Sequence, residues 1–437
     1  MALTRRQFLQ CGAVTAAAIT SPHPLLRAMF GARTAHATPA DAVVVIIQLQ
    51  GGNDGLNTLI PIDDAVTVQQ RTLYEAARPN LRIAPTELFA TEIDADPVKG
   101  NRLALHPAMT DLRALYDLGK LAVVAGVGYP NPNLSHFESE DIWFSGDAGL
   151  ATPNSGWFGR YLESSFTPTD LVAIDIDNTM CPLFLAQNAN ILTVQGLSAF
   201  NLPSPDLAAN EALVEAMYEI EADSMETSGV QLALGAAGKV LLGQMDDYAA
   251  VSTNWSSHLD PLPSGLARRL KQIASILRYD AQNPSTPLGA RFFHVRIGGF
   301  DTHTQQGTAA GNQATLLESV AQAMKAFYDD TVDLGAASRC LTMTFSEFGR
   351  RVAENGNAGN AGTDHGAASV LFVAGEPVTG GVYGTLPALN DLDSGNLKSN
   401  VDFRQVYATI IDKWLATPGA HVPLLPDSPY TTLSFLA

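Results

Sequence analysis

The sequence is poor in cysteine and in basic residues. It has 3 cysteines among 437 residues, so no network of disulfides supports the fold. Lys and Arg number 26 against 44 Asp and Glu, which gives a formal net charge of −18 at pH 7. Such an acidic chain is repelled by nucleic-acid phosphates and anionic membranes, so we expect neither as a partner. No uncharged apolar run approaches the roughly 18 residues of a transmembrane helix, so no stable membrane span is predicted.

Acidic residues are also missing from positions 1–37. Arg5 and Arg6 precede a small, uncharged apolar stretch, and the Ala-His-Ala of residues 35–37 resembles a small-x-small cleavage site. This pattern is typical of a twin-arginine signal peptide. It predicts the twin-arginine translocase as a partner during export and a periplasmic or extracellular location for residues 38–437. Because that pathway carries folded proteins, often with a cofactor already bound, it favours a metal.

Short runs rich in β-branched residues alternate with helical patterns along the rest of the chain. This alternation predicts an α/β fold with a central, mostly parallel sheet sandwiched by helices. We expect a single domain over residues 38–437, with a helical insertion around 204–280. The predicted strands are 42–49, 120–128, 171–176, 291–297, 340–345 and 369–375, and the predicted helices are 204–222, 265–281, 312–330 and 402–416.

Polar, titratable side chains stand beside the ends of these predicted strands. In open α/β sheets, sites form beyond the carboxyl ends of the strands, so we expect the side chains to gather at one sheet edge. Carboxylate and neutral imidazole are both good ligands for zinc and similar divalent ions. In chain order, the side chains at the strand ends are Asp54 in a Gly-rich loop, Ser135 and His136, Asp301 and His303, Glu347 and Arg350, and Asp364 and His365.

Each motif also has a simpler structural interpretation. Gly51 to Gly55 suits a tight turn, Ser135 suits a helix N-cap, and His365 suits a hydrogen-bonded turn. Glu347 and Arg350 have the spacing of an ion pair on a helix surface. The joint pattern favours a site, because turn chemistry alone does not select Asp, Ser, His and Glu at each strand end.

His136 and His294 are interpreted separately. His136 stands beside Ser135 and either assists the chemistry of that residue or points elsewhere. His294 lies within a predicted strand and is expected in the core.

The ordered motifs resemble a bacterial exported family called domain of unknown function 1501. They are QLQGGNDGLNTLIP (48–61), NLSHFESEDIW (133–143), GGFDTH (298–303), TFSEFGRR (344–351) and GTDHG (362–366) followed by GGVYG (380–384). That family resembles the alkaline phosphatase and sulfatase superfamily, which implies a one- or two-metal site and a nucleophile at a helix start. The resemblance implies Ser135 as the nucleophile. It further implies that Asp54, Ser135 and Glu347 hold one metal, and that Asp301, His303 and His365 hold the other.

The sequence departs from the superfamily pattern at Glu347-Phe348, where phosphatases carry an Asp-His pair. The Asp301 group therefore suits zinc, whereas the all-oxygen Asp54 group suits a second divalent metal such as magnesium, calcium or manganese. The predicted function is an exported metal-dependent hydrolase of phosphate or sulfate esters on small molecules or glycans, with Arg350 or Arg351 steadying the ester oxygens. The alternative is a non-catalytic exported or cell-surface binding or assembly protein that keeps the fold and one metal.

Overall fold

A computed structural model describes residues 41–65, 68–149, 154–167, 170–187, 189, 191–197 and 247–437. All six predicted strands are present and belong to one central sheet. The predicted signal peptide and the first part of the predicted insertion, including helix 204–222, lie outside the described residues. The strands of this sheet are β1 (Val43–Leu49), β5 (Leu121–Gly128), β6 (Ala173–Asp175), β7 (Ile191–Thr193), β8 (Phe292–Ile297), β9 (Cys340–Phe345), β12 (Ser369–Ala374), β13 (Gly381–Gly384) and β16 (Val401–Asp402).

The central sheet is mostly parallel, as predicted. Its order is β13-β5-β12-β9-β1-β8-β6-β7, with β16 paired to β5. β1 runs parallel to both β8 and β9, so their carboxyl ends share one edge. β12 runs antiparallel to both β5 and β9. The segment before β12 therefore reaches the edge that the segments after β1, β8 and β9 also reach, which is why His365 can join the residues that follow those strands.

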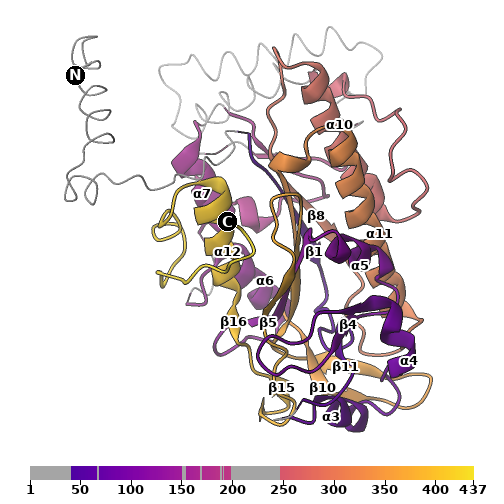
Figure 1. The fold of residues 1–437 in the computed structure, drawn as a ribbon. Coiled ribbons are helices and arrows are strands. Elements are labelled where there is room, and N and C mark those ends of the chain that lie inside the picture. The colour runs from indigo at the N-terminus through magenta and orange to yellow at the C-terminus, as the bar shows by residue number, and fades with distance from the viewer. Residues whose placement is uncertain are drawn as a thin grey trace, which may run out of the picture.

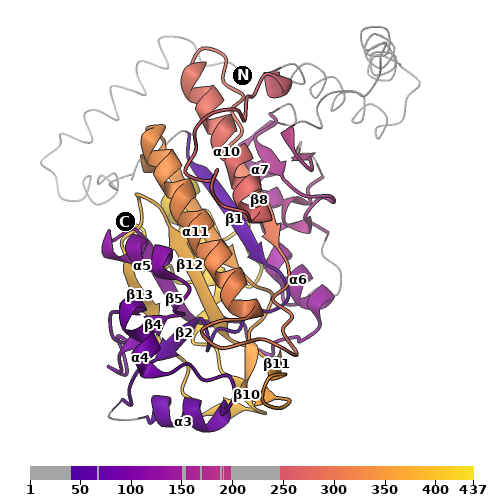
Figure 2. The same ribbon diagram turned by 90° about the vertical axis from the view of Figure 1, so that its right-hand side faces the viewer.

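Helices cover both faces of the sheet (Figure 1). α10 and α11 lie side by side on one face, together with α5, while α6, α7 and α12 lie on the other (Figures 1 and 2). The helices predicted at 265–281 and 312–330 correspond to α10 and α11. The helices are α3 (Gln70–Ala77), α4 (Pro85–Leu88), α5 (Thr110–Asp117), α6 (His136–Ser145), α7 (Trp157–Ser165), α10 (Gly265–Gln282), α11 (Asn312–Asp333) and α12 (Phe403–Ile410), which continues as a π-helix, η5 (Ile411–Leu415).

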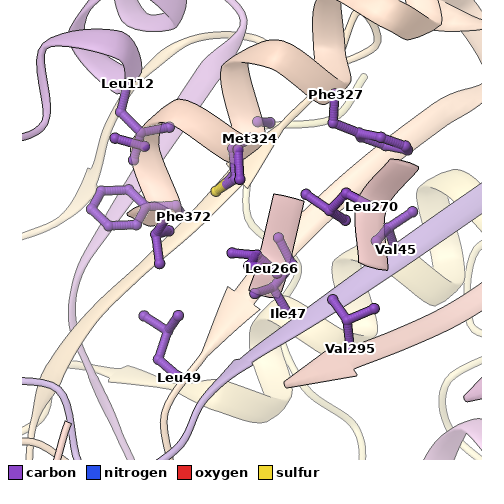
Figure 3. Packing of buried hydrophobic residues seen from close by; sticks show 14 of the residues in the cluster. Val45, Ile47, Leu49, Leu112, Leu266, Leu270, Val295, Met324, Phe327 and Phe372 are labelled. Atoms are coloured by element: carbon purple, nitrogen blue, oxygen red, sulfur yellow. The ribbon is translucent and has the colours of Figure 1, made fainter. Parts of the chain in front are cut away.

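The core consists of two apolar layers, one on each face of the sheet. Successive residues of a strand point to opposite faces, and β1 follows this rule. Val45 and Ile47 join the cluster formed with α10 and α11, whereas Val44 and Ile46 join the cluster formed with α6, α7 and α12. Figure 3 shows part of the first layer, where Phe327 and other side chains of the helices face β1. Because β1 is buried on both faces, it reads as a continuous apolar run.

Three small sheets lie outside the central one. β2 (Leu59–Pro61), β4 (Leu103–Leu105) and β3 (Glu92–Ile93) form the first, and β14 (Leu392–Asp393) pairs with β15 (Asn396–Leu397) in the second. β10 (Arg350–Asn355) pairs with β11 (Gly362–His365) in the third, which lies beyond one end of the central sheet (Figure 2). Cys181 and Cys340 are both free. Within the described ranges, no helix is both long and apolar enough to cross a membrane.

Candidate metal centre

The loops after β1 and β8 approach each other very closely at the carboxyl edge of the sheet. Gly51 has a φ of +120°, and a Cβ at this position would lie 2.3 Å from the backbone nitrogen of Asp301. Only glycine allows both that backbone angle and that contact. The backbone N–H of Gly51 also donates to Oε1 of Glu347 at 2.8 Å. The glycine-rich loop therefore brings the segments after β1, β8 and β9 together.

Asp301, His303 and His365 meet at this edge. Nε2 of His303 lies 3.1 Å from Oδ1 of Asp301, and Nε2 of His365 lies 3.2 Å from the same oxygen. The two Nε2 atoms are 3.0 Å apart. Ligands of a tetrahedral zinc ion, each about 2.0–2.2 Å from the metal, lie roughly 3.3–3.5 Å from one another. The three side chains are therefore spaced as the ligands of one ion would be.

His136, the first residue of α6, adds a third imidazole. Its Nδ1 lies 2.7 Å from Oε1 of Glu347, and its Nε2 lies 3.6 Å from Oδ2 of Asp301. Ligand atoms of His136, Asp301 and His365 all lie within 4.8 Å of one another, so these three side chains could also hold a metal. No ligand role was predicted for His136, because the direction of a side chain beside the predicted nucleophile depends on where the helix starts.

The three imidazoles are oriented in the same way. Nδ1 of His365 lies 2.8 Å from the carbonyl oxygen of Leu134, and Nδ1 of His303 lies 3.2 Å from Oδ1 of Asp364. Nδ1 of His136 faces Glu347. A carbonyl oxygen only accepts, so Nδ1 of His365 carries the proton and Nε2 keeps its lone pair. Imidazoles that ligate metals are usually fixed by such outer hydrogen bonds. The donor set therefore fits a divalent metal with nitrogen and oxygen ligands.

Two pKa shifts reflect the charges at this centre. The hydrogen bond to Glu347 raises the pKa of His136, against the opposing effect of partial burial. Partial burial acts to raise the pKa of Asp301, but the hydrogen bond and the positive charge of Arg350 outweigh it and hold that pKa below its usual range. Asp301 is therefore a charged carboxylate, as a metal ligand has to be.

Arg350 is fully buried, with no exposed part of its side chain. Nη2 donates to Oδ1 of Asp301 at 2.7 Å and to the carbonyl oxygen of Phe300 at 3.0 Å. Nε donates to the carbonyl oxygen of Gly52 at 2.7 Å, and Nη1 donates to that of Thr363 at 2.9 Å. The guanidinium thus holds the loops around Asp301. This differs from the predicted role of steadying ester oxygens, because a substrate in solvent does not reach a fully buried group.

Asp54 lies in a buried ion pair with Arg78, and the side chains of both residues are 0% exposed. Nη1 of Arg78 donates to Oδ2 of Asp54 at 2.5 Å, and Nη2 donates to Oδ1 at 3.0 Å. Nε2 of Gln306 donates to Oδ2 at 2.6 Å. Metal binding at Asp54 would require these bonds to break and would leave a buried guanidinium unpaired. The sequence did not reveal this pair, because Arg78 is remote from every motif.

Ser135 and Glu347 complete the set of predicted site residues. Ser135 occupies the N-cap position of α6, yet its hydroxyl makes no capping hydrogen bond. It lies between Leu134, whose carbonyl oxygen contacts His365, and His136, which belongs to the candidate metal group. Glu347 is fully buried and orients His136. Phe348 packs against the rings of His136 and His365, with centroid distances of 4.8 and 4.5 Å.

Comparisons with known proteins give a partial family match and distant structural neighbours. The model of a family described as "Protein of unknown function (DUF1501)" matches residues 287–419, which include Asp301, Glu347 and His365. No curated protein matches the chain. The crystal structure of the PsFucS1 sulfatase from Pseudoalteromonas sp. is similar at 11% identity and a TM-score of 0.32, covering 97% of this chain and 77% of that one. A mutant TAB5 alkaline phosphatase with magnesium in its M3 site is similar at 10% identity and a TM-score of 0.27, covering 78% and 94%.

Replacing Arg78 should destabilise the protein strongly. Arg78→Ala leaves the Asp54 carboxylate buried without its cation, which costs about 3–5 kcal/mol. Arg102 forms ion pairs with Asp63 and Glu92, but its side chain is 47% exposed. Arg102→Ala should therefore cost far less stability than Arg78→Ala does. Denaturant unfolding of both variants measures the difference, and equal losses would refute the structural role assigned to the Asp54 pair.

Removing an imidazole from the centre should weaken metal binding. We expect His365→Ala to lower zinc affinity by more than the roughly 10- to 100-fold cost of losing an outer hydrogen-bond partner. Glu347→Gln, which removes only the charge that orients His136, should fall within that range. Isothermal titration with zinc measures both affinities. His258 is exposed and pairs with Asp333 away from the centre, so His258→Ala serves as the control and should bind zinc as the wild type does.

Proposed function

We propose that this protein is an exported, metal-dependent hydrolase of phosphate or sulfate esters, with one metal held by His136, Asp301 and His365 and with Ser135 as the nucleophile. His303 contacts two of these ligands and is the candidate for a fourth. Zinc suits a set of imidazoles and one carboxylate. The substrate class and the twin-arginine export of the protein follow from the sequence motifs.

One observation carries the proposal. His136, His303 and His365 each engage an outer acceptor through Nδ1 and turn Nε2 toward the single carboxylate of Asp301. A cluster of imidazoles in a protein core usually serves to pack or to form separate hydrogen bonds. Convergence of their second nitrogens on one carboxylate instead suits a shared cation, because it places several lone pairs around one point.

Ser135 is available for attack on a bound ester. Its hydroxyl makes no capping bond, and the residue is partly exposed at the start of a helix of 10 residues. A helix N-terminus carries free N–H groups and a positive dipole end, which together favour a bound anion such as a phosphate or sulfate. A bound divalent metal would polarise the ester and lower the pKa of an adjacent hydroxyl. Arg350 keeps Asp301 charged and in place, while its neighbour Arg351, which is partly exposed, is our candidate to contact ester oxygens.

A binding or assembly role is the alternative. It is favoured because the carboxylates of the second predicted metal group are already bonded to other residues. Asp54 is bonded to Arg78 and Gln306, and Glu347 is bonded to Gly51 and His136. Neither carboxylate is free for a second magnesium, calcium or manganese ion. A single-metal centre suits hydrolysis by one ion, but it equally suits an exported protein that uses its metal only to bind a ligand or to stabilise its fold.

Hydrolysis of 4-nitrophenyl phosphate and 4-nitrophenyl sulfate by the zinc-loaded protein distinguishes the two functions. We expect turnover by the wild type and loss of turnover in Ser135→Ala, because the nucleophile is absent. Zinc binding to that variant should be unchanged, because the serine is not part of the imidazole group. Ser165 is an exposed serine on α7, and Ser165→Ala is the matched control that should keep full activity.

The enzyme proposal fails if Ser135→Ala hydrolyses every ester as fast as the wild type does. It also fails if no ester is hydrolysed with zinc, magnesium, manganese or calcium. In the second case, zinc binding that depends on His365 would support the binding-protein alternative.

A further inference from the structure

A cavity of about 240 Å³ lies beside α6. α6 contributes Glu140 and Asp141 to its wall, and β8 contributes His294 and Arg296. Cys181, from the segment that follows β6, also lines the cavity. None of these residues takes part in the candidate metal centre, so the cavity needs an explanation of its own.

Asp175 links His294 to Cys181. Oδ1 of Asp175 lies 2.8 Å from Nδ1 of His294, and Oδ2 accepts the backbone N–H of Cys181 at 2.6 Å. Asp175 is 0% exposed, His294 is 1% exposed and Cys181 is 6% exposed. The prediction that His294 is buried in a strand is therefore correct, but the residue has a buried carboxylate as its partner and does not simply fill the core.

The second nitrogen of His294 is unpartnered. Nε2 is buried and makes no hydrogen bond of ordinary geometry in the described part of the chain. Asp175, on the Nδ1 side of the ring, does not line the cavity, whereas His294 and Cys181 do. The imidazole of His294 and the thiol of Cys181 therefore share one wall of the cavity. A buried imidazole nitrogen left without a partner is rare enough to require an explanation.

The charges of the neighbouring groups act on His294. Burial by itself would lower the pKa of His294, but the negative charge of Cys181 and the hydrogen bond and charge of Asp175 outweigh it and raise that pKa to about 10. An imidazolium beside a thiol favours the thiolate, which is the nucleophilic form of cysteine. Asp175, Cys181 and His294 do not bring three ligand atoms within 4.8 Å of one another, in contrast to the candidate metal group. Their arrangement suits proton transfer better than metal binding.

We propose that Cys181 is a nucleophilic thiol, with His294 as its proton acceptor and Asp175 as the positioning residue, and that it reacts with small neutral or cationic disulfides that enter this cavity. The arrangement of nucleophile, base and orienting carboxylate is the one that activates cysteine in other proteins. This site is independent of the proposed ester hydrolysis.

The reaction balances without a further oxidant. The thiol proton passes to His294, and the sulfur of Cys181 attacks one sulfur of the disulfide RS–SR. A new S–S bond joins Cys181 to SR while the old S–S bond breaks. The leaving RS⁻ takes a proton from His294 and departs as RSH. The described residues offer Cys340 as the other thiol, but it is buried in β9, and burial raises its pKa to about 12.

The cavity wall selects the charge of the reagent. Glu140, Asp141 and Asp177 give it three carboxylates, against the single cation of Arg296. Nε of Arg296 lies 2.8 Å from Oδ2 of Asp177, so that cation is already paired. Asp175 and Tyr407 of α12 also face the thiol site, and burial, with a smaller effect from the charge of Cys181, raises the pKa of Tyr407. A neutral or cationic disulfide should therefore enter more readily than an anionic one.

The test uses the full chain with Cys11→Ser, so that Cys181 and Cys340 are the remaining thiols. The folded protein is treated with 4,4′-dithiodipyridine, cystamine or the dianion 5,5′-dithiobis(2-nitrobenzoate), and the modified cysteine is identified by peptide mass spectrometry. We expect one equivalent to react, at Cys181. The neutral and cationic reagents should react at least about 10-fold faster than the dianion at low salt, once each rate is divided by the rate with a free thiol.

The pH dependence separates an activated thiol from an ordinary one. The rate at Cys181 should fall less than about 10-fold between pH 8 and pH 6, whereas an ordinary thiol loses roughly 100-fold over this range. His294→Asn should restore the ordinary pH profile, and Asp175→Asn should give an intermediate one. His258→Asn, at an exposed histidine away from the cavity, is the control and should keep the wild-type profile.

Three results would overturn the proposal. They are no labelling of Cys181 in the folded protein, labelling of Cys340 at an equal rate, and a wild-type profile in folded His294→Asn. Circular dichroism checks that each variant is folded. If His294→Asn does not fold, the pH profile and reagent selectivity of the parent protein decide the question by themselves.

Discussion

The buried guanidinium of Arg350 is the interaction on which the candidate metal centre depends. It donates to the backbone carbonyls of Gly51 and Gly52 after β1, of Phe300 after β8 and of Thr363 in β11. It also donates to the Asp301 carboxylate, so one side chain fixes both the loops and the residue on which the imidazoles converge. A lysine could not replace it, because only the planar guanidinium offers five donors in fixed directions.

The fold could be predicted well from the sequence because its signals are local. Strands buried on both faces are continuous apolar runs, and each such run became a strand of the central sheet. The gathering of polar residues at one edge followed from the parallel arrangement. The reversal of β12 could not be read from its residues, since the direction of a strand depends on its partners. That reversal is nevertheless what brings His365 to the shared edge.

The candidate site was predicted less completely, because its details depend on contacts between residues far apart in the chain. Asp301, His303 and His365 were expected together and do meet. The family resemblance implied that Asp54 is a ligand, but its partner Arg78 lies just after α3, in a region that carries no motif. The relation between Glu347 and His136 was equally hidden. The residues alone do not say whether a buried carboxylate binds an ion or orients an imidazole that does.

The ligands of the candidate metal group come from segments that are distant in sequence, namely the start of α6, the loop after β8 and the end of β11. An ion bound to all three would act as a cross-link that closes two large loops of the chain. In the unfolded state these ligands are far apart and bind the ion poorly, so binding would favour the folded state. Tight metal binding would then occur only in the folded protein, since the full ligand set exists only after the sheet has assembled.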